Sequence, residues 1–397
     1  GKSTLFRMII KEESPDEGQI SFPEKKRIAY FSQNVGEMKG RSALDEVLAG
    51  DDKIVVLLAD LSKSTTTAGF HNEYPKRSYN IGIAEQNMLG SAAGLSLTGK
   101  IPYVSTYGVF VSGRAYDQIR TTICYSNLNV KIGGAHGGIS VGPDGATHQA
   151  LEEIGLMRGL PNMTVIVPCD YHETYKATKA SADIPGPVYI RFGREAIPVI
   201  TKPETPFVFG KGQIFKNGKD VSIIACGSMV HEAIIAADKL KTEGIDCKVI
   251  NIHTVKPIDK ELIIESAKET GAIVTAEEHQ IMTGFGSAVS EVIVQNCPVP
   301  IEMVGIDDTF GESGTPEELM EAYHLTSNDI IDKVKKGEFR LDLYYRLNVI
   351  RIQVPSLSER KDDIPLLAVH FLDKYNKHIN KKVSGITDEA MTVLKNY

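Results

Sequence analysis

The sequence predicts two consecutive α/β domains with mostly parallel sheets, and a small fragment at each end of the chain. Short β-branched runs alternate with longer amphipathic stretches, as between IVVLLA at residues 54–59 and the stretch at 84–97. The runs are apolar throughout, so each strand is expected to be buried on both faces, which is typical of parallel sheets covered by helices. A proline-rich connector at residues 198–210 separates two such series.

The first domain is expected at residues 51–197 and the second at residues 211–336. In the first, the helix at 84–97 is followed by four expected strands, PYVST, NVKIGG, TVIVP and PVYIR. In the second, VSIIACG, CKVINIHTVKP and AIVTAEEH alternate with expected helices at 230–243 and 259–269. The next turn, TGFGSA, has the glycines of an anion-binding turn, but a turn this short more often serves close packing.

Composition excludes several classes of function. The chain has 397 residues and is 42% hydrophobic, which is enough to form ordinary cores. A net charge of -7 without a long Lys/Arg run argues against a nucleic-acid or anionic-membrane surface. The longest apolar runs are strand-sized and no basic leader precedes one, so we expect neither membrane insertion nor export. The five cysteines have no paired spacing, which favours free thiols in the reducing cytoplasm over a disulfide framework or a metal site.

Residues 78–97, SYNIGIAEQNMLGSAAGLSL, place Glu85 at the mouth of a strand-to-helix turn. A carboxylate there is poorly solvated, so its pKa is expected to be raised, which suits an acid that hydrogen-bonds a nitrogen heterocycle. The alternative is a glutamate that merely caps the first turn of an ordinary helix.

The two ends of the chain resemble pieces of ATPases. Residues 1–50 are similar to the beginning of an ABC-type ATPase, with Lys2 at the end of a phosphate-binding loop and Gln33 as the Q-loop residue. The earlier glycine of that loop, the signature motif and the acidic Walker B strand are missing, so nucleotide hydrolysis is not expected. Residues 337–397 resemble the end of the AAA+ module of bacterial enhancer-binding activators, in which arginines matching Arg340 and Arg346 act on a neighbouring subunit's nucleotide. We expect a small helical appendage here.

The central piece, residues 51–336, resembles the carboxy-terminal half of transketolases. Five blocks carry the resemblance, in the family's order and spacing. They are residues 78–97 and the segments DLSKST at 60–65, STYGVFVSGRAYDQIR at 105–120, AHGGISVGPDGATHQALEE at 135–153 and PVYIRFGRE at 187–195. The resemblance implies a pyrimidine-binding domain, a transketolase carboxy-terminal domain, and ketol transfer with thiamine diphosphate and Mg²⁺.

The resemblance also implies a role for individual residues. Glu85 would hydrogen-bond the ring nitrogen of the cofactor's aminopyrimidine, Tyr107 and Phe110 would flank that ring, and Asp60 would lie near the thiazolium. His136 and His148 match histidines that touch the substrate oxygens, where neutral imidazoles can move protons. The remaining matches concern the sugar phosphate: Asp144 for a hydroxyl, and Arg194, the nearby Arg191 and Ser64 for the phosphate.

The residues that bind Mg²⁺ and the diphosphate in this family lie in an amino-terminal half that this sequence does not show. The sequence therefore resembles the smaller subunit of split, two-gene transketolases. It is expected to act only with an amino-terminal partner subunit that supplies the metal ligands, in a homodimer or a heterotetramer. Arg41 lies at the wrong distance from Asp60 to match the family's other phosphate-binding arginine.

Several alternatives remain open from the sequence. Deoxyxylulose-5-phosphate synthases and pyruvate dehydrogenase beta subunits share the domain order, although AEQNM and the block at 135–153 look more like transketolase. A nucleotide-dependent regulator built on the two terminal fragments, or a fusion that merely folds, would be a different class of protein.

Overall fold

The structure is a computed structural model that describes residues 51–336, except 63 and 66, and residues 357, 360–379 and 382–396. The chain divides into two compact units, residues 1–338 and 339–397. The predictions for Lys2, Gln33, Arg41, Arg340 and Arg346 fall outside the described residues.

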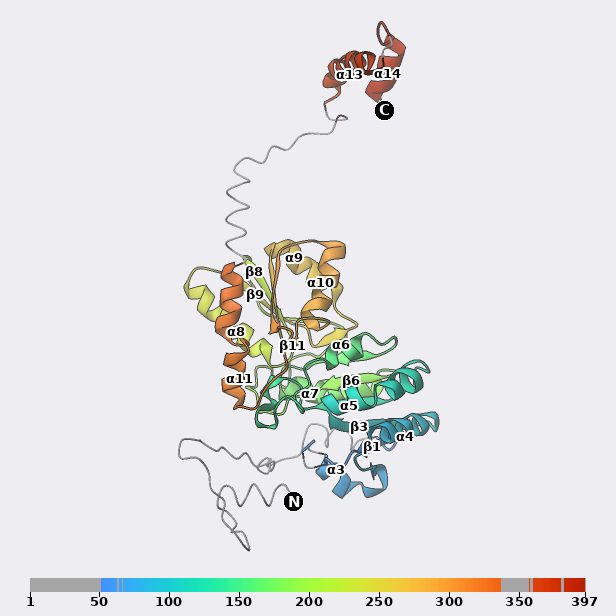
Figure 1. Ribbon diagram of the computed structural model, residues 1–397, viewed down its shortest axis with the longest axis vertical. Helices are drawn as coiled ribbons and strands as arrows, with labels where there is room; N and C mark the ends of the chain where they lie inside the picture. Colours follow the sequence, from blue (N-terminus) through green and yellow to red (C-terminus); the bar gives the residue numbers. More distant parts are fainter. Residues whose placement is uncertain are drawn as a thin grey trace, which may run out of the picture. The chain divides into compact units, whose positions relative to one another are not determined.

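The first domain is built on a seven-stranded sheet with the order β10-β5-β6-β4-β3-β1-β2 (Figure 1). Its strands pair in parallel except β10, which is antiparallel to β5. The strands are β1 (Ile54–Leu58), β2 (Ser78–Asn80), β3 (Ile101–Tyr107), β4 (Lys131–Ala135), β5 (Thr164–Ile166), β6 (Val188–Arg191) and β10 (Thr254–Lys256).

All five residues of β1 are buried, because the sheet is covered on both faces. Val55 and Leu57 belong to a large apolar cluster that includes Met88 of α4, whereas Ile54 and Val56 pack with a different cluster. The helical segments of this domain are α3 (Ala68–Glu73), η1 (Pro75–Arg77), α4 (Glu85–Leu97), α5 (Gly108–Arg114), η2 (Gln118–Cys124), η3 (Ile139–Asp144), α6 (Glu153–Arg158) and α7 (Tyr171–Asp183).

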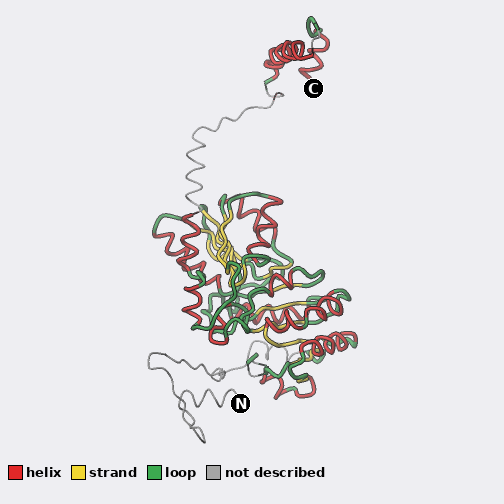
Figure 2. Tube along the Cα trace, viewed as in Figure 1, coloured by secondary structure: helices red, strands yellow, loops and turns green. Residues whose placement is uncertain are grey.

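The second domain has a five-stranded sheet with the order β12-β11-β8-β9-β7. In Figures 1 and 2 its central strands lie between α8 on one side and α9 and α10 on the other. The strands are β7 (Gln213–Lys216), β8 (Val221–Ala225), β9 (Cys247–Asn251), β11 (Ile273–Gln280) and β12 (Ile301–Ile306). The helices are α8 (Met229–Thr242), α9 (Lys260–Thr270), α10 (Phe285–Asn296) and α11 (Pro316–Ala322), and residues 327–336 are helical as well. β7 alone is antiparallel to its neighbour, so the prediction of two mostly parallel α/β domains is confirmed.

The glycine-rich turn before α10 serves packing. The carboxylate of Glu277, on β11, accepts the backbone N–H groups of Phe285 and Gly286 at the start of this helix, at 2.5 and 2.7 Å. A Cβ atom at Gly286 would lie only 2.6 Å from the hydroxyl of Thr275. The N–H groups that an anion would need are therefore already bound to a side chain of the neighbouring strand.

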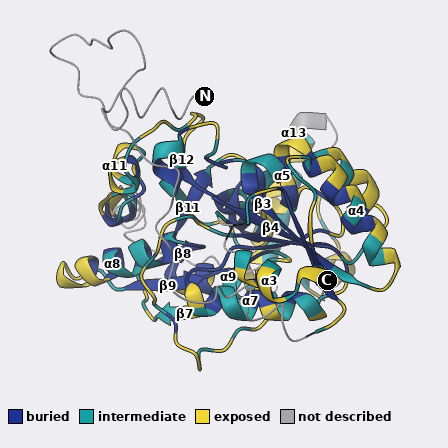
Figure 3. Cartoon of the chain, turned by 90° about the horizontal axis from the view of Figure 1, so that it is seen from below, coloured by how far each residue is buried: buried dark blue, intermediate teal, exposed yellow. Residues whose placement is uncertain are grey.

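The two sheets are joined by the chain itself. CKVINIHTVKP divides into β9, in the second sheet, and β10, which lies at the edge of the first sheet beside β5. Figure 3 shows the strands of both sheets as the most deeply buried part of this unit. The other unit contains η5 (Lys361–Asp363), α13 (Ile364–Ile379) and α14 (Asp388–Asn396). None of the helices within the described ranges is long and apolar enough to cross a membrane.

Candidate functional site

The candidate site lies where β1, β3 and β4, three neighbouring strands of the first sheet, end. Tyr107 is the last residue of β3, His136 follows β4 directly, and Asp60 follows β1 by two residues. Because parallel strands end at the same edge of a sheet, these residues are brought together from distant parts of the sequence. Ligands of open α/β sheets commonly bind at this edge.

Glu85 is the first residue of α4 and only 4% of it is exposed. It begins the buried stripe of this helix, which continues through Met88, Leu89, Ala92 and Ala93. This spacing of three and four residues forms one face of a helix, so the packing of the apolar residues also holds Glu85 against the sheet. The burial of the carboxyl group thus follows from the helix pattern.

Arg114 is a partner of Glu85 that the sequence motifs did not reveal. Its Nη1 donates a hydrogen bond of 2.8 Å to Oε1 of Glu85, and its guanidinium lies over the ring of Phe110, 3.8 Å from the ring centre. The side-chain amide of Gln86 donates to the backbone oxygen of Arg114, which fixes the end of α5 against the start of α4. Phe110 and Arg114 are four residues apart on α5, so the sequence did contain the signal that they share a helix face.

Four rings form one cluster beside this ion pair. Tyr107 stacks on His136 with ring centres 4.0 Å apart, and lies 5.6 Å from Phe110. The ring of His148 meets Phe110 edge-on at 5.3 Å and Tyr107 at 5.9 Å. The two imidazoles and the two aromatic rings singled out from the sequence therefore do lie together, next to the Glu85–Arg114 pair.

His136 is buried, with 3% of its surface exposed, and its backbone has a φ of 59°. Its Nδ1 has no hydrogen-bond partner within the described part of the chain. Burial is the main cause that lowers the pKa of His136, and together with the positive charges of Arg194 and the nearby His148 it brings the pKa to about 4. The ring is therefore neutral at physiological pH, and its buried Nδ1 keeps an unused hydrogen-bonding position.

The low pKa of His136 makes stability depend on pH. The unfolded chain binds a proton at this residue below about pH 6.5 while the folded chain does not, so stability falls as pH decreases from about 6.5 to 4. This effect amounts to about 3 kcal/mol. We expect His136→Phe to weaken the loss of unfolding free energy over this range, as measured by urea denaturation at several pH values. His324→Gln, at a side chain that is 81% exposed, is the control. Parallel profiles for His136→Phe and the parent would contradict the assignment.

Arg194 and Asp144 lie together at the rim of the site. Nη1 of Arg194 donates to the backbone oxygen of Val141 at 2.7 Å and is 3.3 Å from Oδ2 of Asp144. Nε of Arg194 is buried and has no hydrogen-bond partner among the described residues. This arginine therefore holds the segment that carries Asp144, and its Nε also lies 3.7 Å from Oε1 of Glu195.

The structure does not bring Arg191 to the same place. Its side chain is 6% exposed and forms an ion pair with the fully buried carboxylate of Glu153. Its Nη2 donates to the backbone oxygens of Ala150 and Glu278. Arg191 thus joins the two domains below the site, and its guanidinium is not presented to a phosphate.

The other two predicted residues lie after β1. The backbone N–H of Asp60 donates to Oδ1 of Asn80, and Nδ2 of Asn80 donates back to Oδ1 of Asp60 at 3.0 Å. This link ties the end of β1 to the end of β2, five residues before Glu85. Ser64 is partly exposed in the turn that precedes α3.

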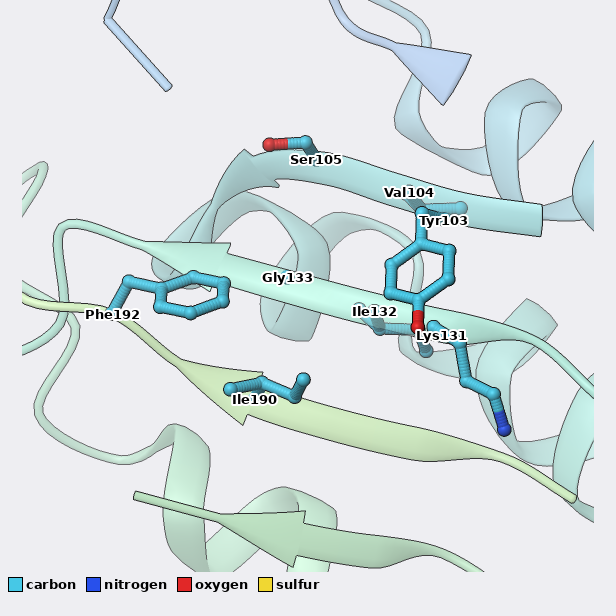
Figure 4. Close-up of a pocket in the computed structure, with 8 residues that line it drawn as sticks. All are labelled: Tyr103, Val104, Ser105, Lys131, Ile132, Gly133, Ile190 and Phe192. Carbon is cyan, nitrogen blue, oxygen red and sulfur yellow. The ribbon is translucent and has the colours of Figure 1, made fainter. Parts of the chain in front are cut away.

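A separate cavity of about 10 Å³ lies within the sheet, between β3, β4 and β6 (Figure 4). It is lined by Tyr103, Lys131 and Phe192 among others, and has room for no more than about one water molecule. The Nζ of Lys131 donates to the backbone oxygens of Ile184 and Gly186, which follow α7. This cavity is too small for a cofactor. In the described ranges there is no group of three or more His, Cys, Asp or Glu residues arranged for a metal ion.

Comparisons with known proteins identify both domains of the chain. The family model of the transketolase pyrimidine-binding domain matches residues 39–199, and that of the transketolase C-terminal domain matches residues 210–330. The model of an AAA+ ATPase lid domain matches residues 358–397.

Two relatives and one solved structure show how far the similarity extends. A 6-deoxy-6-sulfo-D-fructose transketolase subunit from Clostridium sp. (strain MSTE9) is 42% identical over 281 residues, which cover 71% of this chain and 87% of the relative. An apulose-4-phosphate transketolase subunit from Phocaeicola vulgatus is 38% identical, over 72% of this chain and 91% of its own. A structure titled as a split gene transketolase, an inactive β4 tetramer, is 51% identical, with a TM-score of 0.70 over 74% of this chain and 95% of its own. The chain belongs to the transketolase family, and what it matches there is the carboxy-terminal half.

Proposed function

We propose that this chain is the carboxy-terminal subunit of a thiamine-diphosphate-dependent transketolase. In combination with an amino-terminal partner subunit, it transfers a two-carbon ketol unit between sugar phosphates. The observation that carries the proposal is the single cluster in which the buried Glu85, the rings of Tyr107 and Phe110, and the neutral His136 lie side by side. The relatives named as transketolase subunits, which match nearly their whole length, support the same assignment.

The residues present fit the aminopyrimidine part of thiamine diphosphate. Such a ring needs a carboxyl group at its edge and apolar surfaces on its faces, and Glu85, Tyr107 and Phe110 provide them, with Asp60 at the margin. Oε2 of Glu85 has no hydrogen-bond partner among the described residues, so the carboxyl group keeps one oxygen for a ring nitrogen. The chemistry that thiamine diphosphate supplies, when bound, is a carbon nucleophile for the ketose carbonyl. We assign the Mg²⁺ and diphosphate ligands to the partner subunit, as the family's arrangement implies.

The remaining residues would act on the sugar. The unpartnered Nδ1 of the neutral His136 can accept a hydrogen bond and a proton from a substrate hydroxyl, with His148 as a second imidazole beside it. Asp144 would accept from another hydroxyl. Arg194, whose Nε makes no hydrogen bond within the described residues, would bind the phosphate, with Ser64 as a neutral donor, whereas the buried Arg191 has no such role in this proposal.

The proposal is tested by mixing the chain with a transketolase amino-terminal subunit, thiamine diphosphate and Mg²⁺, and by assaying ketol transfer from a ketose phosphate to an aldose phosphate. We expect activity in the mixture and in neither subunit alone, because each holds only part of the cofactor. Activity of this chain alone, or an inactive mixture in which the two subunits form a stable complex by gel filtration, would refute the proposal. The solved relative titled as an inactive β4 tetramer agrees with the first expectation, and the same gel filtration distinguishes a homodimer from a heterotetramer.

Two further parts of the proposal concern location and the ends of the chain. Cys124, Cys169, Cys226 and Cys297 are free thiols, which supports a cytoplasmic location. The lid-domain match supports the resemblance of residues 337–397 to an AAA+ activator, and the ABC-type resemblance of residues 1–50 rests on the sequence alone.

A further inference from the structure

The segment that carries His136, Asp144 and His148 has little regular structure of its own. We call residues 136–149, between β4 and α6, the substrate loop. It contains the short helical segment η3 and three glycines with positive φ, namely Gly138 (99°), Gly142 (75°) and Gly145 (74°). Glycine-rich backbone of this kind is conformationally free, so contacts from outside must fix it.

One such contact comes from Glu278, on β11 of the second domain. Its Oε1 accepts the backbone N–H of Ser140, in the substrate loop, at 2.7 Å. Its Oε2 accepts the hydroxyl of Ser228, which precedes α8, also at 2.7 Å. The residue is 4% exposed, so water scarcely competes for these charge-assisted hydrogen bonds.

The glycine two residues before Ser140 fits this contact. A Cβ atom at Gly138 would lie 2.1 Å from Oε1 of Glu278, so any side chain at position 138 would displace the carboxylate. The N–H of Gly138 meanwhile donates to the backbone oxygen of Ala150. The backbone two residues after His136 therefore lies so close to the carboxylate of Glu278 that only glycine leaves room for it.

The far end of the substrate loop is also held by the second domain. The side-chain amide of Gln149 donates to the backbone oxygens of Ile139, in the loop, and Glu312, in the second domain, at 3.1 and 2.9 Å. Gly145 lies against Ser313, whose hydroxyl would be 2.6 Å from a Cβ atom there. The first domain thus carries the catalytic side chains, and the second domain supports the loop that presents them.

We propose that Glu278 is a positioning residue for the transfer reaction, and that it acts by fixing the substrate loop through Ser140. The inference rests on the proposed function for the roles of His136 and Asp144. Loss of the carboxylate leaves the N–H of Ser140 without an acceptor in a partly buried place and frees the loop, while Glu85, Tyr107 and Phe110 remain held by other elements. We therefore expect the rate of ketol transfer to fall while the affinity for the cofactor stays unchanged.

The first measurement uses the chain alone and compares Glu278→Met, which keeps the length without an acceptor, with Glu278→Gln, which restores one acceptor oxygen. Hydrogen exchange at the Ser140 amide is expected to be about tenfold or more faster in Glu278→Met, and to return towards the parental rate in Glu278→Gln. Glu277→Gln is the matched control, because the adjacent side chain points to the opposite side of β11 and contacts α10. An unchanged rate at Ser140, or a rise that all amides share, would overturn the proposal.

The second measurement uses the mixture of both subunits. Glu278→Met is expected to lower kcat/KM for the donor ketose phosphate about tenfold or more, with binding of thiamine diphosphate, measured by equilibrium dialysis, at the parental level. Faster exchange at Ser140 with parental kinetics would show a structural brace only and reject the positioning role. If the parental mixture itself is inactive, the proposed function fails, whereas hydrogen exchange still decides whether Glu278 holds the loop.

Discussion

Replacement of Glu85 by alanine is expected to reduce ketol transfer by the two-subunit mixture several hundredfold or more. The reason is that the carboxyl group, buried at the start of α4, is the only group at this edge of the ring cluster assigned to exchange a proton with the cofactor. Removal of a positioned acid or base typically costs a factor of about 10² to 10⁴. The rate is measured at saturating thiamine diphosphate, so that weaker binding does not imitate a slower reaction.

Three controls make this result specific. Glu73→Gln changes an exposed carboxylate at the end of α3 and should keep the parental rate. Glu85→Gln, which keeps the shape but cannot ionise, should be nearly as slow as Glu85→Ala. Both variants at position 85 should elute with the partner subunit in gel filtration. A rate within a few fold of the parent for Glu85→Ala would remove this residue from the mechanism.

Replacement of Arg191 by methionine is expected to lower the free energy of unfolding by about 3–5 kcal/mol. This loss is typical when one member of a buried ion pair is removed, because the other charge remains without compensation. Here the stranded group is Glu153, whose carboxylate is fully buried and lies 3.9 Å from Nε2 of His279. Urea denaturation followed by circular dichroism measures the change.

The double variant Arg191→Met/Glu153→Gln provides the test of the pair. It should recover part of the loss, since the amide no longer carries a charge that needs Arg191. Arg120→Met, at an exposed arginine, should alter stability by less than about 0.5 kcal/mol. If Arg191→Met costs no more than Arg120→Met but raises KM for the sugar phosphate, the side chain serves the substrate, contrary to its place in the structure.

Much of the fold could be predicted from local patterns. The helices expected at 84–97, 230–243 and 259–269 agree within a residue at each end with α4, α8 and α9. The apolar runs became strands because every residue of a doubly covered strand is buried. The division of CKVINIHTVKP between two sheets could not be predicted in this way, because a run of β-branched residues does not state which neighbour it pairs with.

In the candidate site, too, local motifs could be interpreted from the sequence, whereas contacts between distant residues could not. Glu85, His136 and His148 stand in short motifs, so their types and spacing could be interpreted from the sequence alone. Arg114 and Glu278 could not be connected to them, because their contacts, Arg114 to Glu85 and Glu278 to Ser140, join residues 29 and 138 positions apart. Such contacts depend on how helices, strands and loops pack against one another, and this packing cannot be inferred from a single sequence.

The contribution of β10 to the sheet of the first domain limits the motion of the two domains relative to each other. Because β10 follows β9 of the second domain and pairs with β5 at the edge of the first sheet, backbone hydrogen bonds connect the two domains. A hinge motion that separated the two domains would have to break the backbone hydrogen bonds between β10 and β5. On the proposed function, substrates are therefore expected to enter and leave through movements of side chains and loops rather than through separation of the two domains.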